Sequence, residues 1–377
     1  LIDIAKVPIL NDANFLNKKY NYFAMIVEKN KPIKQVFVGS SDSLNYAYYL
    51  YETYIQGKSQ DIRLNSTSYD IMFSLIDSSI DRNKEIIFFP EGVYSFVNPL
   101  TLFNKTRKKY LIDYRKISNI NNLNDLLIRK EKIKNFNSIT LFYNPLFNDN
   151  SPNKAINFTS KNRTIRGGQI NPLPGTKIEG EEIERICKIK NIRVEKFSGK
   201  DANEENFKST KLGDILHFAT HGYYFNKYEH QMFFPIDTTK YISPYLLNGL
   251  LLTRAENTLK NEFKYSENGW LTGLEIQSLD FSEVNLIVLS ACETMIGKEI
   301  EGRGIFGLSH SLKIAGGRNI ISSLWKVDDE ATKQLMINFY EKLNNTSDIN
   351  KCLYSAILEL RNTYSHPYYW GPFIYQY

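Results

Sequence analysis

The sequence lacks the signatures of several common protein classes. No apolar run approaches the roughly 18–20 residues that a membrane-spanning helix requires, so no membrane segment is expected. The only three cysteines, Cys187, Cys292 and Cys352, stand far apart and cannot all pair. This argues against a disulfide framework and favours a reducing, cytoplasmic compartment. Neither a CxxC nor an HExxH motif occurs, and no cofactor is expected.

Histidine is also scarce, with five in 377 residues, yet two of them stand four apart in "ILHFATHG", residues 215–222. The apolar residues of this stretch predict a buried strand that ends at a glycine turn. On a helix such spacing would suit zinc, but on a strand it only places His217 and His221 on one face. Because no cysteine or acidic residue lies nearby, we expect no metal there.

The overall composition is that of a globular protein, with 42% hydrophobic and 23% charged residues, and the length allows two domains. The net charge of +6 is uneven, because ten Lys and Arg oppose three acidic residues between Asn104 and Lys134. This stretch is either a solvated face or a docking surface for an acidic partner or nucleic acid. It carries few aromatic residues and no RNA-binding signature, so direct nucleic-acid binding stays open.

Apolar strand-like runs alternate with stretches of helical periodicity, which predicts an α/β fold with a mainly parallel sheet flanked by helices. Strands are predicted at 34–40, 84–92, 138–147, 192–197, 214–220, 284–290 and 319–325, with an edge strand or ribbon at 245–253 and a strand or packed segment in the tail. Helices are predicted at 43–56, 68–79, 178–190, 202–209, 270–280, 303–315, 329–344 and 349–363. The segment 148–176, rich in Asn, Pro, Gly and Ser, predicts a linker.

Two predicted strands end next to a residue suited to nucleophilic catalysis. "DILHFAT" runs into His221 and Gly222, and "NLIVLSA" runs into Cys292. Ligands of open parallel sheets bind beyond the carboxyl ends of the strands, so neighbouring strands would bring His221 and Cys292 together there. The imidazole would take the thiol proton and the thiolate would attack a carbonyl. The amides of Gly222 and Cys292 would then form an oxyanion hole.

The other candidate residues have simpler interpretations. His217 stands in mid-strand and is expected to be a core histidine that donates to the backbone. Cys187 and Cys352 fall within amphipathic helices and are expected to be packing residues. Ser290 and Ser309 lack the GxSxG context that would make either a nucleophile.

The motifs "ILHFATHG", "LIVLSACETMIG" and "EGRGIFGLSHSLKIAGGRNIISSLWKVDDEAT" together resemble the CHAT domain, a caspase-like protease family often found behind TPR repeats. The resemblance covers roughly 84–377 and extends to the wider clan of caspases, separases and gingipains. It implies that His221 is the general base and Cys292 the nucleophile. It also implies that the amides of Gly222 and Cys292 form the oxyanion hole.

The resemblance gives Asp329 a possible role as well. Separases share the "LW-x-V-x-D" stretch, in which the acidic residue four positions after the tryptophan lines the pocket for a basic P1 side chain of the substrate. That position is Asp329 here. Asp329 can also be read as a helix N-cap, since "DDEATKQL" looks like a helix start, and the two roles are compatible.

The family further implies two halves, an inactive caspase-like half at 1–165, which has no histidine, and an active half at 166–377. The expected function is a cysteine endopeptidase that cuts a specific protein partner. An activating protein or ribonucleoprotein would order the long loops 222–244 and 293–303, in a bacterial defence or regulatory system such as a CRISPR-associated one. The alternative is a catalytically silent caspase-like scaffold.

Overall fold

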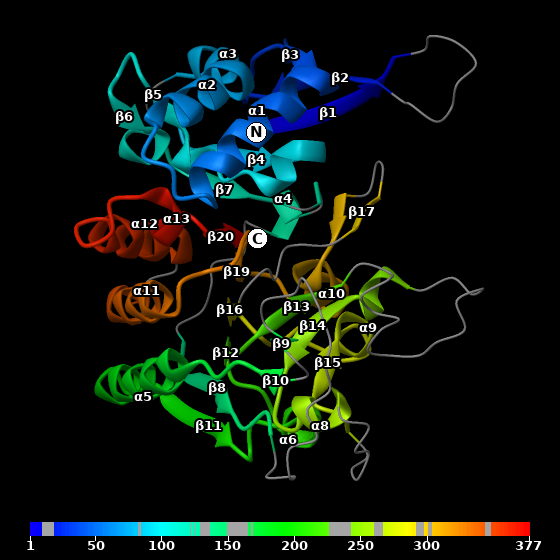
Figure 1. Cartoon of the computed structure of the whole chain (residues 1–377), viewed down its shortest axis with the longest axis vertical. Coiled ribbons are helices and arrows are strands. Elements are labelled where there is room, and N and C mark those ends of the chain that lie inside the picture. Colours follow the sequence, from blue (N-terminus) through cyan, green and yellow to red (C-terminus); the bar gives the residue numbers. More distant parts are fainter. Residues whose placement is uncertain are drawn as a thin grey trace. The chain divides into compact units, whose positions relative to one another are not determined.

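The computed structural model describes all residues except 10–18, 82–83, 121, 124, 129–135, 149–164, 167–168, 226–242, 260–266, 292–297, 301–303 and 344–347. The chain forms two compact units (Figure 1). Unit 1 comprises Leu1–Lys130, Glu299–Gly304 and Ser365–Tyr377, and unit 2 comprises Glu131–Lys298 and Ile305–Tyr364.

Unit 2 is built on a parallel sheet with the strand order β11-β8-β12-β16-β19. Its strands are β8 (Ser138–Pro145), β11 (Arg193–Gly199), β12 (Ile215–Ala219), β16 (Leu286–Ser290) and β19 (Ile320–Ser323). Every residue of β12 and β16 is buried. Such continuous apolar runs are typical of parallel strands covered on both faces, and the predicted α/β fold with a mainly parallel sheet is confirmed.

Helices cover both faces of this sheet. The helices of unit 2 are α5 (Pro174–Ile189), α6 (Glu204–Ser209), α8 (Ala255–Leu259), α9 (Gly273–Ile276), α10 (Leu308–Ile314), α11 (Asp329–Lys342) and α12 (Ile349–Leu360). Leu216 and Phe218 of β12 join an apolar cluster with residues of α6, α9 and α10. His217, between them, contacts side chains of α5 and α11 on the other face. The two-residue period of the strand thus separates an apolar face from one that carries histidine.

The ends of α5 and α11 are fixed by identifiable contacts. Pro174 occupies the first turn of α5, where its missing N–H costs no hydrogen bond. Asn191, with a φ of 57°, follows the helix end in the left-handed conformation that asparagine tolerates. The ammonium of Lys190 donates to the carbonyls of Tyr340, Glu341 and Leu343 at 2.7–2.8 Å and so caps the end of α11.

A small antiparallel sheet follows β12. Its strands are β13 (Gly222–Tyr224), β14 (Asn248–Leu251) and β15 (Trp270–Thr272), with β14 in the middle. The predicted edge position of the strand within 245–253 is therefore wrong. The predicted helix 270–280 is also wrong at its start, because buried Trp270 belongs to β15. Thr272 and Glu275 then form a capping box that starts the short α9.

Unit 1 contains both parallel and antiparallel strands, in the order β20-β7-β4-β1-β2-β3. Its strands are β1 (Ile2–Pro8), β2 (Tyr20–Ile26), β3 (Lys34–Ser40), β4 (Ile86–Phe89), β7 (Ile117–Asn119) and β20 (Phe373–Gln376). β1, β2 and β3 pair antiparallel, whereas β4 pairs parallel with β1 and β7, and β20 pairs parallel with β7. The helices α1 (Ser41–Ile55), α2 (Ile62–Met72) and α3 (Ser74–Ser78) follow β3.

The remaining elements are short. They are β5 (Phe103–Asn104), β6 (Lys109–Tyr110), α4 (Asp125–Ile128), β9 (Ile165–Arg166), β10 (Gln169–Ile170), β17 (Lys298–Ile300), β18 (Gly304–Phe306), α13 (Pro367–Trp370) and the 3-10 turns η1 (Gly92–Phe96), η2 (Pro99–Thr101), η3 (Leu111–Asp113) and η4 (Pro244–Leu246). Because β18 occupies 304–306, the helix predicted from 303 begins only at Leu308. The predicted linker 148–176 lies largely outside the described residues.

The basic stretch 104–134 is not a uniform solvated face. Arg115 is only 2% exposed, and its Nε donates to Oδ1 of Asp77 at 2.7 Å. Its other guanidinium nitrogens donate to the carbonyls of Asp77, Ile80 and Asp81. One of the ten cations is therefore a structural core residue.

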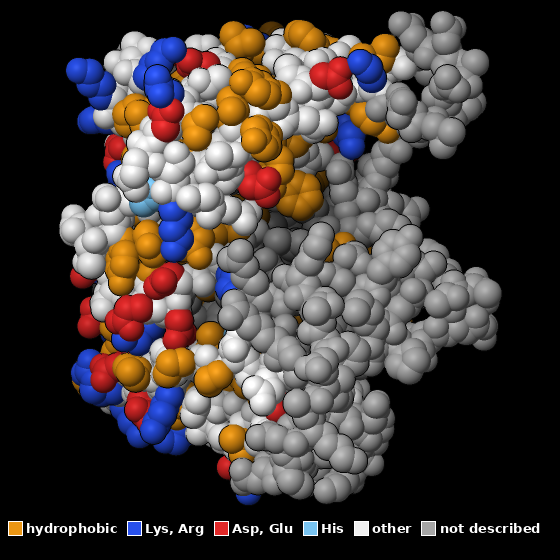
Figure 2. Space-filling model, viewed as in Figure 1, with side chains coloured by type: hydrophobic (Ala, Val, Ile, Leu, Met, Phe, Trp, Pro, Cys, Tyr) orange, Lys and Arg blue, Asp and Glu red, His pale blue; other side chains and the backbone are white. Residues whose placement is uncertain are grey.

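Charged side chains of both signs are interspersed over α5 and β11, at the lower left of Figure 2. Glu184 of α5 pairs with Lys188 of the same helix and with Lys196 of β11. Such a surface is mixed rather than a single-sign patch. None of the described helices is long and apolar enough to cross a membrane.

The division into an inactive half at 1–165 and an active half at 166–377 stays a prediction. In the structure, β8 groups with unit 2, and the final residues, Ser365–Tyr377, group with unit 1. Spatial units and sequence halves are thus different divisions of this chain.

Candidate functional site

The two strands that end in candidate catalytic residues are neighbours. β12 and β16 pair in parallel, and Ala219 aligns with Ser290 at their carboxyl ends. The chain therefore leaves the same sheet edge at Thr220 and at Ala291. Residue 292 lies outside the described residues, so the prediction that its thiol faces His221 stays a prediction.

His221 is buried, with 5% of its surface exposed. Its Nε2 lies 2.6 Å from the carbonyl oxygen of Asn171, and the ring of Phe147 lies 5.5 Å away. Its Nδ1 is buried and has no hydrogen-bond partner among the described residues. Burial lowers the pKa of His221 to about 4, with the Asn171 carbonyl opposing this change and the positive charge of Lys326 adding to it. At neutral pH the ring is uncharged and carries a free basic nitrogen.

The amide of Gly222 points away from the small sheet. The N–H of Leu251 donates to the carbonyl of His221 at 2.9 Å, which makes these two residues a hydrogen-bonded pair of the β13–β14 ladder. Because such pairs alternate along an antiparallel ladder, Gly222 opposite Leu250 belongs to a pair without hydrogen bonds. Its N–H is therefore not used by β14, as an oxyanion-hole donor requires.

A pocket of about 120 Å³ lies at this sheet edge. Its walls come from the segment before α5, from α5 itself, from the ends of β12 and β16, and from the turn into α11. The lining residues are Asn171, Leu173, Thr176, Glu179, Thr220, His221, Ser290, Ala291, Lys326, Val327, Asp329 and Thr332. The pocket thus contains His221, the residue directly before Cys292, and Asp329, three positions that are far apart in the sequence.

Asp329 lines the pocket but is not the N-cap of α11. The cap is Asp328, whose side chain accepts from the N–H of Ala331, so the predicted cap is wrong by one residue. Oδ2 of Asp329 instead accepts from the N–H of Gly175 in the first turn of α5, at 2.8 Å. Burial raises the pKa of Asp329, with the Gly175 amide opposing and the charge of Glu179 adding to it.

His217 is a core residue, as expected, but its partners are side chains rather than the backbone. It is fully buried, with Nε2 2.9 Å from Oε1 of Glu179 and Nδ1 3.1 Å from the hydroxyl of Tyr340. A carboxylate oxygen accepts, so Nε2–H of His217 donates to Glu179, while Nδ1 shares a hydrogen bond with the Tyr340 hydroxyl. The backbone of a strand is already paired in its sheet, which explains why the imidazole bonds elsewhere.

Sequence reasoning missed Asn171, Glu179 and Ser290 as pocket residues. Glu179 did leave a signal, because it stands four residues before Ile183 on the buried stripe of α5, where a carboxylate is unusual. Asn171 contributes only a backbone carbonyl, which no side-chain pattern reveals. Ser290 is buried at 4% exposure, and its hydroxyl has no partner among the described residues.

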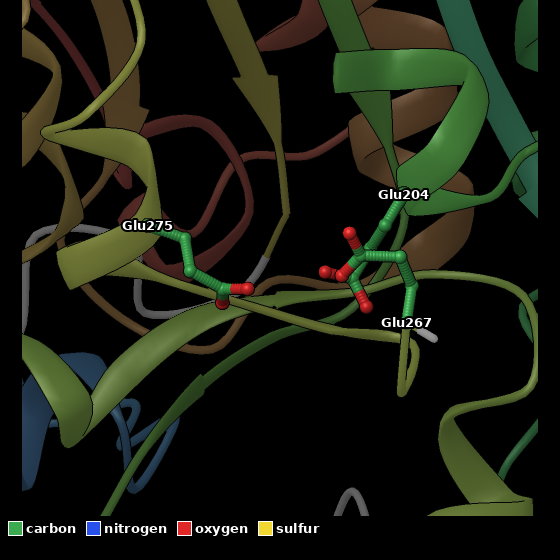
Figure 3. A group of neighbouring side chains, drawn as sticks. All are labelled: Glu204, Glu267 and Glu275. Carbon is green, nitrogen blue, oxygen red and sulfur yellow. The ribbon is translucent and has the colours of Figure 1, made fainter. Parts of the chain in front are cut away.

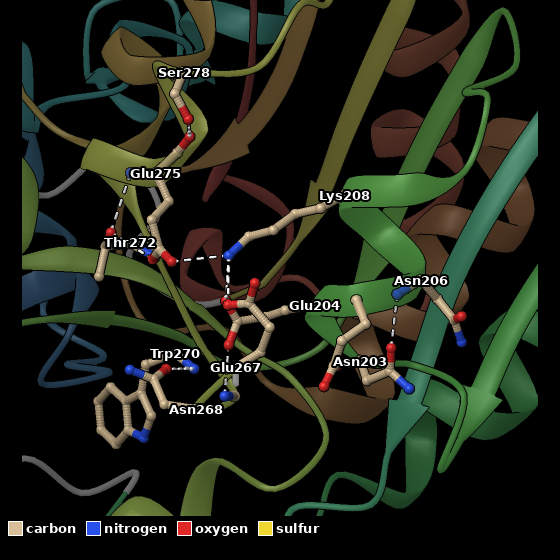
Figure 4. Close-up of polar contacts among 12 residues, drawn as sticks. Asn203, Glu204, Asn206, Lys208, Glu267, Asn268, Trp270, Thr272, Glu275 and Ser278 are labelled. Atoms are coloured by element: carbon tan, nitrogen blue, oxygen red, sulfur yellow. Dashed lines mark hydrogen bonds and ion pairs between the residues drawn. The ribbon is translucent and has the colours of Figure 1, made fainter. Parts of the chain in front are cut away.

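A second group of carboxylates lies around the small sheet. Oxygen atoms of Glu204, Glu267 and Glu275 lie within 4.8 Å of one another, as expected of metal ligands (Figure 3). Figure 4 shows the ammonium of Lys208 among them, at 2.7–3.0 Å from all three. This lysine supplies the positive charge that the cluster needs, so the group links α6 to α9 and to Glu267, in the segment before β15.

Cys187 and Cys352 are buried, and neither forms a disulfide among the described residues. Burial raises the pKa of the Cys187 thiol to about 12, with Lys190 opposing. A thiol of this kind is not a nucleophile at neutral pH, which agrees with the predicted packing role of Cys187.

The fold and the pocket define an α/β protein whose parallel strands present a neutral histidine at their carboxyl ends. The chain belongs to the CHAT domain family, whose model matches residues 63–376. No curated protein matches the sequence.

Among solved structures, the chain is similar to the Arg-specific cysteine proteinase gingipain R (RGPB), at 6% identity and a TM-score of 0.42, covering 89% of this chain and 74% of that chain. The complex of Porphyromonas gingivalis RgpB pro- and mature domains is similar at 8% identity and a TM-score of 0.42, with the same coverage. The Saccharomyces cerevisiae separase in its complex with securin is similar at 13% identity and a TM-score of 0.43, covering 93% of this chain and 21% of that chain. At these values no residue role is transferred from them.

Proposed function

We propose that this chain is a cysteine endopeptidase in which Cys292 is the nucleophile and His221 the general base. The observation that carries the proposal is the pocket that His221 shares with Ala291, the residue directly before Cys292. Nδ1 of His221 is buried and has no hydrogen-bond partner among the described residues, which supports the proposal because a general base needs a basic nitrogen that can take the proton of its nucleophile.

The reaction follows from these groups. Nδ1 of His221 takes the thiol proton of Cys292, and Sγ bonds to the carbonyl carbon of the scissile peptide. The amides of Gly222 and Cys292 donate to the oxyanion, and the N–H of Gly222, which β14 does not use, supports this role. The C–N bond then breaks, His221 returns the proton to the leaving amine, and water hydrolyses the thioester to release the acid.

Asp329 contributes to the pocket for the P1 side chain in this proposal. Its carboxylate lines the same pocket as His221 and is held by the Gly175 amide. A carboxylate in this position favours a basic P1 residue. The Asp329→Asn variant should lose that preference. An unchanged cleavage profile would mean that Asp329 only stabilises the contact with α5 and does not select the P1 residue.

The decisive experiment is a cleavage assay on proteins encoded beside this gene, with fragment ends read by mass spectrometry. The wild type is compared with Cys292→Ala and with Cys352→Ala, a matched control in which a buried thiol far from the pocket is removed. Cuts that disappear only in Cys292→Ala establish the peptidase. Cleavage that survives in Cys292→Ala would exclude the dyad, and no cleavage by any variant would favour the scaffold.

The resemblance to caspase-like proteases extends the proposal to regulation. An activating protein or ribonucleoprotein would switch the enzyme on in the cytoplasm, within a bacterial defence or regulatory system. The same assay with and without candidate activators tests this part. Full activity of the isolated chain would exclude the need for an activator.

A further inference from the structure

We propose that Glu179 is a second specificity-determining residue of the pocket, which together with Asp329 binds the guanidinium group of a substrate arginine. His217 is the positioning residue that holds Glu179 in place. The inference rests on the proposed peptidase function, because the bound arginine is the residue before the scissile bond.

Glu179 is a buried carboxylate of the pocket wall. It is 2% exposed and lines the pocket, and His217 is its one hydrogen-bond partner among the described residues. A buried carboxylate is costly unless it is paired and hydrogen-bonded. His217 bonds to Oε1 alone, so a cationic donor in the pocket would satisfy the second carboxylate oxygen of Glu179.

Asp329 is the second carboxylate of the pocket, and it too has an oxygen that a cationic donor could bind. Among the described residues its carboxylate has one hydrogen bond, from the Gly175 amide, and it lines the same pocket as Glu179. The charge of Glu179 contributes to raising the pKa of Asp329, after burial, so the two carboxylates repel each other. A cation bound between them would relieve this repulsion.

Arginine fits this arrangement better than lysine. Its planar guanidinium offers five donors in a fixed fork, whereas an ammonium is a compact point charge. Two carboxylates that each have one oxygen committed elsewhere require donors that point in two directions. The hydroxyl of Ser290, which has no partner within the described part of the chain, is a further acceptor on the pocket wall.

The pocket also contains one cation, which limits where the guanidinium binds. Lys326 lines it and is more exposed than Glu179, so the positive charge lies nearer the solvent. Neither carboxylate forms an ion pair with Lys326 among the described residues. The buried end of the pocket is therefore acidic, and it is this end that a long side chain reaches.

The position of Glu179 depends on His217. The imidazole is fully buried between Glu179 of α5 and Tyr340 of α11, so it has no freedom to turn. Its Nε2–H fixes Oε1 of Glu179 and leaves the other oxygen for a ligand. Replacing His217 by a residue without a donor should release the carboxylate.

Binding can be measured without catalysis, in the Cys292→Ala background. Calorimetry with Nα-acetyl-arginine amide, Nα-acetyl-lysine amide and the neutral Nα-acetyl-citrulline amide should give affinities in the order arginine, lysine, citrulline. Glu179→Gln should reduce the arginine-to-citrulline ratio about tenfold or more, since hydrogen bonds to charged groups are the strong ones. Glu181→Gln, on an exposed position of the same helix, is the matched control and should leave the ratio unchanged.

The role of His217 has its own test. His217→Gln keeps a donor near the Nε2 position and should retain part of the arginine-to-citrulline ratio, whereas His217→Leu should lose it. A thermal melt of each variant separates this effect from unfolding. Equal losses of selectivity in both folded variants would exclude the positioning role.

The same substitutions are then made in the active chain and assayed on peptides with Arg or citrulline at P1. An unchanged selectivity in Glu179→Gln, or no binding of any of the three amides by the Cys292→Ala chain, would overturn the inference. If arginine binding depends on Glu179 but no peptide is cut in a Cys292-dependent way, the peptidase proposal fails and the guanidinium site stands. Cleavage without any dependence on Glu179 would leave the peptidase proposal intact.

Discussion

Nε2 of His221 lies 2.6 Å from the backbone carbonyl oxygen of Asn171. A carbonyl oxygen can only accept, so Nε2 carries the proton and Nδ1 of the neutral ring is the basic nitrogen. A backbone group cannot be removed by a side-chain substitution. The structure therefore gives His221 an orientation that tolerates changes in the surrounding sequence.

This relationship predicts the tautomer of His221. In the Cys292→Ala chain, long-range ¹H–¹⁵N NMR should show the ring protonated at Nε2 and unprotonated at Nδ1. The neutral form should persist from neutral pH down to about pH 5, because burial lowers the pKa to about 4. An Nδ1–H tautomer, or a charged ring at pH 6, would contradict the assignment.

The lowered pKa of His221 also predicts a dependence of stability on pH. In the unfolded chain the imidazole protonates near pH 6.5, but in the fold only near pH 4, so stability is full above pH 6.5 and falls between pH 6.5 and 4. At pH 5 this single group should lower the free energy of unfolding by about 2 kcal/mol. Urea denaturation at pH 7.5 and 5 should give a smaller difference for His221→Gln than for the wild type. If the wild type and His221→Gln lost the same free energy of unfolding between pH 7.5 and pH 5, the pKa of His221 would not be lowered in the fold.

The sheet edge of the site could be predicted because its strands carry unambiguous patterns. The runs that became β12 and β16 are apolar on both faces, which marks central parallel strands, and each ends at a small residue beside a catalytic candidate. Ligands of an open parallel sheet bind beyond the carboxyl ends of its strands, so the position of the site follows once the strands are recognised. Sequence reasoning therefore identified both strands and stated their pairing only as a condition for the dyad, whereas the structure supplies the pairing and the pocket.

Contacts between distant elements could not be predicted in the same way. The partner of His217 is on α5, and nothing in its strand indicates Glu179. The choice between Asp328 and Asp329 as the cap of α11 depends on one residue of register, which "VDDEAT" does not fix. The strands β1 and β2 were missed because only a few alternating residues, such as Ile2, Asp3 and Ile4, carry their pattern.

A buried ion pair in unit 1 allows a direct stability test. The side chains of Arg115 and Asp77 are 1% and 5% exposed, and Asp77 also accepts from the hydroxyls of Tyr69 and Tyr114. Arg115→Ala removes one partner of this pair and should lower the free energy of unfolding by about 3–5 kcal/mol, because the remaining charge stays buried. The change should appear as a lower midpoint in chemical denaturation.

Its control is an ion pair on the surface. Arg63→Ala breaks the contact of Arg63 with Asp61, whose side chains are 86% and 37% exposed. The expected cost is much smaller than that of Arg115→Ala, because water and salt screen a solvent-exposed pair. Similar costs for Arg63→Ala and Arg115→Ala would contradict the role assigned to burial.

Gly175 allows the pocket to be changed while the fold is kept. A Cβ at this position would lie 2.6–2.7 Å from the carboxylate atoms of Asp329, so Gly175→Ala must displace that carboxylate. Alanine is otherwise favourable within a helix, by roughly 1 kcal/mol. We expect a nearly unchanged melting temperature and a reduced preference for arginine over citrulline in the binding assay.

Gly180, on the same helix, is the contrasting position. A Cβ there would lie 2.3 Å from the buried ring of Tyr143, so Gly180→Ala should lower the melting temperature through a core clash. Its effect on arginine selectivity should be small. If Gly175→Ala were the less stable of the two and kept its selectivity, the contact between Gly175 and Asp329 would not control the pocket.

The carboxylate cluster around Lys208 predicts a stability trend opposite to that of His221. Burial raises the pKa of Glu204 to about 7, with the charge of Glu275 adding to it and Lys208 opposing. The folded state therefore binds a proton that the unfolded chain releases above about pH 4.5. This contribution to stability is present at low pH and is lost as the pH rises to about 7.

Glu204→Gln removes this titration but keeps an oxygen that can accept from the Gly269 amide, as Oε1 of Glu204 does at 2.5 Å. Between pH 5 and pH 8, the free energy of unfolding of the wild type should fall by about 2–3 kcal/mol relative to that of the variant. Parallel urea titrations of both proteins at the two pH values measure this difference. A constant difference would mean that the ammonium of Lys208 keeps Glu204 ionised throughout, and that the cluster does not respond to pH.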